Sequence, residues 1–146
     1  IKKDSTRSRM GLPDYLLFFR KGDRPCPSAV THTAEEFPVN QWQQWASPVW
    51  MDINATNTLN VRAAREDGDE RHMCPLQLDL IDRAIRLYSN PDDVILSPFG
   101  GVASEGVGAL RAGRRYVGVE LKRSYFDRAC INLDQEDNPR QVGLFG

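Results

Sequence analysis

The sequence predicts an α/β fold of the Rossmann-like kind with a mostly parallel sheet. An apolar strand, a glycine-containing turn and a helix follow one another over residues 94–111, and a second strand, residues 116–120, comes directly after them. Strand, helix and strand in this order imply parallel pairing through a right-handed crossover. The second strand ends in Glu120, 23 residues after Ser97, which is the arrangement by which a βαβ unit holds a nucleoside.

Upstream of this unit we expect a strand and two irregular regions. Residues 15–19 form a nearly continuous apolar run, as in a strand that is buried on both faces. Residues 22–40 contain three prolines and few apolar side chains, which predicts a loop. Three tryptophans lie close together in residues 38–51, and packing in a small core is favoured over stacking on bases. The mixed charges of residues 54–71 predict a solvated helix face and a turn.

The next helix is expected over residues 75–88. Pro75 is acceptable in a first helical turn, and apolar residues recur behind it at helical spacing. The turn Asn90-Pro91-Asp92-Asp93 ends this helix and starts the strand that covers residues 94–96.

Two more helices are expected in the C-terminal half. Residues 103–111 form the first of them, and Gly113 is its expected C-terminal stop. Apolar residues recur at helical spacing from Tyr125 to Leu133 and predict the last helix. The tail, residues 134–146, is polar and is expected to be loose.

Length and composition fit one domain. With 146 residues and 40% hydrophobic residues, the chain has enough apolar material for one core. No apolar run approaches the roughly 20 residues that a membrane-spanning helix requires, and the N-terminus has no apolar signal-peptide region. We therefore expect a cytoplasmic protein with no membrane partner.

The polar composition excludes some classes of site. The three cysteines, Cys26, Cys74 and Cys130, are widely spaced and never form Cys-x-x-Cys, and only two histidines accompany them. Neither a disulfide framework nor a metal site is therefore expected. A net charge of −1 argues against a dedicated electrostatic nucleic-acid binder, but not against a DNA enzyme with a locally basic cleft.

The loop after the first strand of the βαβ unit carries a more specific pattern. It lacks Gly-x-Gly-x-x-Gly and reads Ser97-Pro98-Phe99-Gly100-Gly101-Val102-Ala103-Ser104 instead. This resembles the Asp-Pro-Phe-x-Gly-x-Gly-Thr loop of DNA amino-methyltransferases, which use S-adenosylmethionine to methylate adenine N6 or cytosine N4. Ser97 and Ala103 depart from the aspartate and glycine that are usual in the family.

Two further segments extend the resemblance. The segment His72-Met73-Cys74-Pro75-Leu76-Gln77-Leu78 precedes a helix, at the place of the family's other cofactor-binding motif. The segment Tyr15-Leu16-Leu17-Phe18-Phe19-Arg20-Lys21 is similar to a Glu-Tyr-Leu-Leu-Phe-Arg-Lys strand of such enzymes. Together the motifs cover most of residues 14–133 in one order, and phage-type members are the most similar. The resemblance implies a partial Rossmann-like S-adenosylmethionine-dependent methyltransferase fold.

The resemblance also implies a cofactor site. Glu120 is placed to accept hydrogen bonds from both ribose hydroxyls, with a surface glutamate as the structural alternative. Gly101 gives the backbone clearance to approach the methionine part, and Phe99 borders the cofactor. Three roles stay open for His72: contact with the methionine carboxylate, an ordinary loop histidine, or orientation of Gln77. The implied cofactor-binding residues are His72, Pro75, Leu76, Ser97, Pro98, Phe99, Gly101, Ser104 and Glu120.

Structural roles compete with the cofactor role at several of these positions. Ser104 and Glu105 fit a helix N-terminus, where serine caps the helix and glutamate complements its dipole. Pro75 and Leu76 are expected to act through their backbone. Gly101 also fits an ordinary turn.

The family's catalytic tetrapeptide, Asp-Pro-Pro-Tyr or Ser-Pro-Pro-Tyr, does not occur in the sequence. The segment Ser47-Pro48-Val49-Trp50 lacks the second proline and follows the strand at residues 15–19, so Trp50 is expected to be a packed core aromatic. Ile1 is not an initiator methionine, and the charged residues 2–7 show no helix or strand signal. We therefore expect the C-terminal part of a methyltransferase domain, with no catalytic residue identified in this chain.

One domain is expected over residues 1–146, with a loop-rich insert at residues 22–71 as a candidate target-recognition element and a cofactor-binding βα unit at residues 72–133. The implied function is methyl transfer from S-adenosylmethionine to the exocyclic amine of adenine, favoured over cytosine, in double-stranded DNA of a bacterial or phage-infected cell. The missing N-terminal part or a second copy is a further expected partner. Two alternatives remain: an inactive S-adenosylmethionine-binding or interaction module, and a nicotinamide-dinucleotide domain that uses Glu120.

Overall fold

The computed structural model describes residues 14–22, 29–59 and 75–137. Two strands, β1 and β2, pair in parallel, with Val94 opposite Arg115 and Ser97 opposite Gly118. The predicted βαβ unit and its parallel pairing are therefore confirmed. The elements in chain order are α1 (Val39–Trp45), α2 (Leu78–Tyr88), β1 (Val94–Ser97), α3 (Ser104–Arg111), β2 (Arg115–Gly118) and α4 (Arg123–Asp137).

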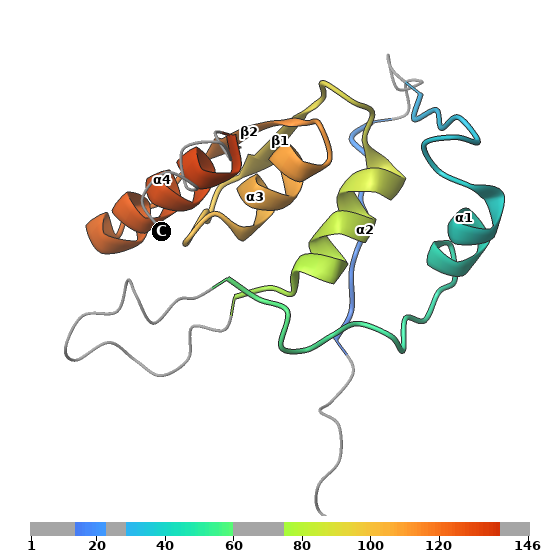
Figure 1. Cartoon of the computed structure of the whole chain (residues 1–146), viewed down its shortest axis with the longest axis horizontal. Helices are drawn as coiled ribbons and strands as arrows, with labels where there is room; N and C mark the ends of the chain where they lie inside the picture. Colours follow the sequence, from blue (N-terminus) through green and yellow to red (C-terminus); the bar gives the residue numbers. More distant parts are fainter. Residues whose placement is uncertain (1–13, 23–28, 60–74, 138–146) are drawn as a thin grey trace, which may run out of the picture.

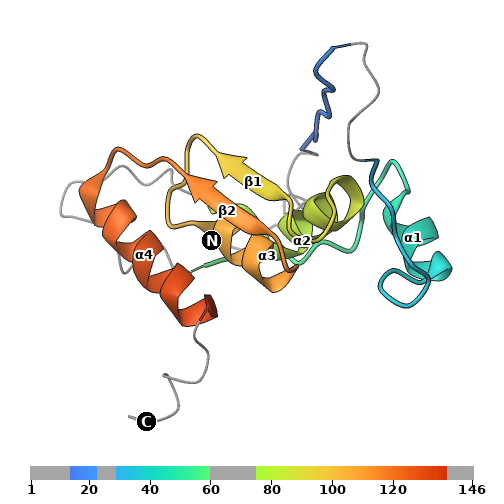
Figure 2. The same ribbon diagram turned by 90° about the horizontal axis from the view of Figure 1, so that it is seen from above.

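Helix α3 is the centre of the packing. It contacts both strands, and α2 and α4 flank it (Figures 1 and 2). Between α2 and α3 lies a buried apolar cluster of Ile81, Ile85, Ala109 and Ala112. The two helices pack tightly at Gly108, because a Cβ atom there would lie only 2.4 Å from Cγ2 of Ile81. This close approach requires a glycine at residue 108.

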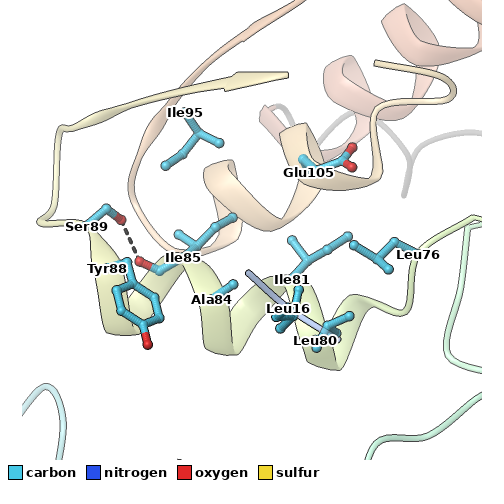
Figure 3. Close-up of a pocket in the computed structure, with 10 residues that line it drawn as sticks. All are labelled: Leu16, Leu76, Leu80, Ile81, Ala84, Ile85, Tyr88, Ser89, Ile95 and Glu105. Carbon is cyan, nitrogen blue, oxygen red and sulfur yellow. Dashed lines mark hydrogen bonds between the residues drawn. The ribbon is translucent and has the colours of Figure 1, made fainter. Parts of the chain in front are cut away.

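A buried guanidinium joins the C-terminal ends of α2 and α3. Arg114 is 7% exposed, and its Nε donates to the Ser89 hydroxyl at 3.1 Å. Its terminal nitrogens donate to two carbonyls, that of Ser89 at 2.7 Å and that of Ala112. Ser89 in turn donates to the carbonyl of Ile85 at 2.6 Å (Figure 3). Arg114 therefore satisfies carbonyls that the two helix ends would otherwise leave without a partner.

The aromatic segment before α2 is fastened to that helix by a salt bridge. Both terminal nitrogens of Arg83 donate to Asp52, at 2.9 and 2.8 Å, and the guanidinium lies 5.4 Å from the ring centres of Trp45 and Trp50. The hydrogen bond from Arg83 lowers the pKa of the Asp52 carboxyl. Packing is therefore confirmed for Trp45 and Trp50, whereas Trp42 is 48% exposed.

The predicted strand at residues 15–19 is wrong. These residues run alongside α2 without strand structure, and Tyr15 and Phe19 are 84% and 89% exposed. The ring of Phe18 stacks on Tyr88 with centroids 4.0 Å apart. A strand exists only where a neighbouring strand pairs with its backbone, and no described strand does so for this segment.

Two predicted helix boundaries need correction. Helix α2 begins at Leu78, so Pro75 precedes the helix and does not lie in its first turn. Helix α4 continues to Asp137, so residues 134–137 are helical and not a loose tail, while residues 138–146 lie outside the described part. Gly113 has φ +72° and ends α3 as predicted.

Two kinds of feature are absent from the described residues. No described helix is both long and apolar enough to cross a membrane. Within the same ranges, no three histidine, cysteine, aspartate or glutamate side chains are grouped so that they could hold a metal ion.

Candidate functional site

The candidate site lies at the carboxyl end of the parallel sheet, where loop residues 98–103 connect β1 to α3. Two backbone hydrogen bonds join this loop to the end of β2: Val119 N–H donates to the Ser97 carbonyl at 2.9 Å, and Gly100 N–H donates to the Val119 carbonyl at 2.7 Å. In open parallel sheets ligands bind at this end of the strands.

Glu120 lies directly beside the loop. One of its carboxylate oxygens accepts a hydrogen bond from Gly101 N–H at 2.7 Å, and the other accepts one from Lys122 N–H at 2.8 Å. Each carboxylate oxygen can accept more than one hydrogen bond, so both retain the capacity to accept from a pair of vicinal hydroxyls. Gly101 adopts φ +54°, in the left-handed region that favours glycine.

The residue before α3 also has a left-handed backbone. Ala103 has φ +65° and ψ +44° and is 1% exposed. This conformation costs a residue with a side chain roughly 1–2 kcal/mol. This chain therefore has alanine, in place of the family's usual glycine, at a position whose backbone conformation glycine would adopt with less strain.

The expected cap of α3 by Ser104 is wrong. Ala103 occupies the N-cap position, Ser104 is the first helical residue, and no side chain caps this helix end. Ser104 is 4% exposed and lies at the start of the helix that follows the loop. The expectation that Glu105 lies in the first turn of α3 is confirmed.

The other predicted site residues differ in exposure. Ser97 is 8% exposed at the end of β1, whereas Phe99 is 88% exposed, so its ring is free to meet a ligand but packs on little of the protein. Pro98 is also exposed, and Pro75 is half-buried. His72 lies outside the described residues.

A cavity of about 250 Å³ lies beside the second motif and reaches the first turn of α3. It lies between α2, β1 and α3, and Leu76 and Glu105 both contribute to its wall (Figure 3). Burial raises the pKa of the Glu105 carboxyl, because this carboxylate is held among apolar side chains. The other lining residues are Leu16, Leu80, Ile81, Ala84, Ile85, Tyr88, Ser89 and Ile95.

The Tyr116 hydroxyl is a buried polar group close to Gly100 of this loop, and the sequence did not point to it. Burial raises its pKa, and the negative charge of Glu105 raises it further. The Ser97 side chain opposes this shift in part, but the two hydroxyls do not meet the geometry of a hydrogen bond. Among the described residues, the Tyr116 hydroxyl has no hydrogen-bond partner.

Asp79 positions the start of α2, a role that the sequence did not reveal. Its carboxylate accepts hydrogen bonds from Asn54 N–H at 2.9 Å and from Nδ2 of Asn57 at 2.5 Å. Leu78 N–H donates to the Asn57 carbonyl at 2.8 Å. An acidic residue in the first turn of a helix was the available signal, but its partners lie 22 and 25 residues away.

Comparison with known proteins gives one consistent result. The family model described as DNA methylase matches residues 4–131. Type II methyltransferase M.HinfI of Haemophilus influenzae is 33% identical over 107 residues, which are 73% of this chain and 29% of the relative. DNA adenine methyltransferase YhdJ of Escherichia coli K12 is 34% identical over 68 residues, 47% of this chain and 23% of the relative.

A solved structure agrees with the sequence relatives. TTHA0409 of Thermus thermophilus, assigned as a DNA modification methylase and solved with S-adenosyl-L-methionine, has a TM-score of 0.56 and 27% sequence identity. The match covers 79% of this chain and 40% of that structure. The chain thus spans less than a third of the two curated relatives and two fifths of the solved one.

Proposed function

Because this chain belongs to the N6/N4 DNA methylase family, we propose that it forms the S-adenosylmethionine-binding part of a DNA methyltransferase. The observation that carries the proposal is the hydrogen bond between Glu120 and Gly101 N–H. It brings a strand-end carboxylate and a glycine loop together at the carboxyl end of a parallel sheet, as nucleoside binding requires. The similarity to a methylase solved with S-adenosyl-L-methionine supports the same ligand.

Each predicted residue has a proposed part in holding the ligand. Glu120 accepts from the ribose hydroxyls, and the loop from Ser97 to Gly101 offers backbone to the methionine part. Phe99 covers the ligand with its exposed ring, and Leu76 contributes apolar surface from the segment just before α2. Pro75, Pro98 and Ser104 are the remaining residues that we propose to contact the ligand. His72 keeps the three alternative roles given above.

S-adenosylmethionine supplies a methyl group on a sulfonium sulfur. When bound, it would give this methyl group to the exocyclic nitrogen of the target base: the nitrogen–carbon bond would form as the carbon–sulfur bond breaks, the bonding pair would stay on sulfur as a neutral thioether, and the nitrogen would lose a proton. The target base must leave the duplex stack to reach the ligand. Catalysis would then depend mainly on holding the exocyclic nitrogen in line with the methyl group. Residues 29–59 contain no lysine or arginine, so any phosphate contact from this part of the proposed target-recognition insert would come from uncharged hydroxyl, amide or backbone N–H donors.

Calorimetric titration with S-adenosylmethionine tests the binding proposal. We expect saturable binding by the wild-type chain and roughly a hundredfold weaker binding by Glu120→Ala, because two hydrogen bonds to a charged acceptor are lost. Glu136→Ala is the matched control: it removes a carboxylate on α4 that pairs with Arg111, far along the chain from the loop, and should leave the affinity unchanged. Failure of the folded wild-type chain to bind would refute a self-sufficient cofactor site, and equal binding by Glu120→Ala would refute the role of Glu120.

Adenine N6 is the proposed target, ahead of cytosine N4. The named activity of YhdJ as a DNA adenine methyltransferase supports this choice. Nucleoside analysis of DNA from cells that express the full-length protein should then show N6-methyladenine. Detection of N4-methylcytosine in its place would reverse the assignment.

A non-enzymatic binding module is the second candidate function. The observation that favours it is the absence of Asp-Pro-Pro-Tyr from the sequence. Trp50 of the partial copy donates its indole N–H to the Trp45 carbonyl at 2.8 Å and packs on Arg83, so it acts as a structural aromatic. Methyl transfer by the full-length protein would exclude this candidate. A binding assay in which S-adenosylmethionine and a nicotinamide dinucleotide compete would distinguish these two candidate functions from the third, a nicotinamide-dinucleotide domain.

A further inference from the structure

Three glycines enclose the ring of Tyr116. A Cβ atom at Gly118 would lie 2.4 Å from the Tyr116 hydroxyl oxygen, and one at Gly106 would lie 2.7 Å from the ring atom Cδ1. A Cβ atom at Gly100 would lie 3.2 Å from the same hydroxyl oxygen. Gly100 and Gly118 lack positive φ, so steric clearance for the tyrosine, and not backbone conformation, explains glycine at these two positions.

The three glycines come from the three parts of the site that must stay in register. Gly100 belongs to the loop, Gly106 to α3, and Gly118 to the end of β2. Tyr116 therefore fills the space in which these parts meet. The same loop is bonded to the residues that follow β2, from Gly100 N–H to the Val119 carbonyl and from Gly101 N–H to Glu120.

We propose that Tyr116 is a positioning residue of the ligand loop: its ring, seated among the three glycines, holds Gly101 N–H within reach of Glu120. The ligand role of the loop rests on the proposed function, whereas the support of the loop by the ring does not. If Tyr116 only filled space in the core, replacing its ring by another apolar side chain would not affect the hydrogen bond from Gly101 N–H to Glu120. The two cases are therefore separable by experiment.

Amide hydrogen exchange at Gly101 gives the first test and needs no ligand. In the Tyr116→Leu variant we expect Gly101 to exchange roughly tenfold faster relative to Val107, because one hydrogen bond of the loop is lost. Val107 N–H is bonded to the Ala103 carbonyl inside α3 and corrects for any general loss of stability. Tyr116→Phe keeps the ring and should stay within about twofold of the wild type. An unchanged ratio in Tyr116→Leu would overturn the proposal.

The glycine side of the contact gives a second test, in which the substitution is made at Gly118 with and without the aromatic ring. Gly118→Ala places a methyl group against the Tyr116 hydroxyl and should speed Gly101 exchange relative to Val107. In the Tyr116→Leu background the ring atoms that the new methyl group would meet are gone, so the same substitution should have a clearly smaller effect. Equal effects of Gly118→Ala in both backgrounds would show that the ring does not carry the contact.

Titration with S-adenosylmethionine distinguishes this inference from the proposed function. If the wild-type chain binds and Tyr116→Leu binds at least tenfold more weakly while Tyr116→Phe binds normally, the positioning role extends to the ligand. If Tyr116→Leu binds as tightly as the wild type, the role is overturned. If the wild-type chain does not bind at all but Gly101 exchange follows the ring, the proposed function fails and the support of the loop by Tyr116 holds.

Discussion

Arg114→Met should lower the free energy of unfolding by about 3 kcal/mol, because it removes the guanidinium that joins the ends of α2 and α3. Methionine fills a similar volume but donates no hydrogen bond. The carbonyls of Ser89 and Ala112 would then stay buried without this partner. Urea unfolding followed by far-ultraviolet circular dichroism measures the effect.

Arg111→Met is the control for the arginine at residue 114. Arg111 also lies at the end of α3, but its side chain is 50% exposed and pairs with Glu136 at 2.9 Å. Because exposed ion pairs contribute little, this variant should lose less than about 1 kcal/mol. Similar losses in both variants would mean that the buried hydrogen bonds of Arg114 are not what stabilises the helix ends.

Gly108→Val should cost about 3 kcal/mol, because α2 and α3 meet at this residue without room for a side chain. The added Cβ atom would lie 2.4 Å from Cγ2 of Ile81, so the helices must separate. Thermal unfolding of the single variant should show a lower midpoint.

The double variant Gly108→Val/Ile81→Ala identifies the cause of that loss. Removing the Ile81 side chain beyond Cβ creates space for the new methyl groups, so the two costs should sum to clearly more than the measured cost of the double variant. Fully additive costs would place the damage elsewhere than in the contact between Gly108 and Ile81.

Local sequence signals were sufficient for the βαβ unit. The strand from Val94, the helix ending before Gly113 and the second strand all depend on residues close together in the chain. They occur where predicted, except that β2 ends at Gly118, so Glu120 lies just after the strand and not at its last residue. The strand expected at residues 15–19 failed because its apolar run says nothing about which backbone would pair with it.

The site was predictable in outline but not in its internal contacts. The spacing between Ser97 and Glu120 indicated that the Glu120 carboxylate belongs to the site. In the structure this carboxylate accepts a hydrogen bond from Gly101 N–H. The glycine enclosure of Tyr116 has no sequence signature, because each of its glycines also fits a plain loop, helix or strand position. The pairing of Asp52 with Arg83 joins residues 31 positions apart and is likewise set by tertiary packing.

The contact of Arg83 with Trp45 and Trp50 has an optical consequence. All three tryptophans of the chain lie in residues 42–50, so indole emission reports on the attachment of this segment to α2 and is blind to the β1–α3–β2 unit. Circular dichroism, in contrast, is dominated by α2, α3 and α4. Coincident transitions by the two signals would define a single cooperative unit, and an earlier change in emission would mark the segment before α2 as a separately melting layer.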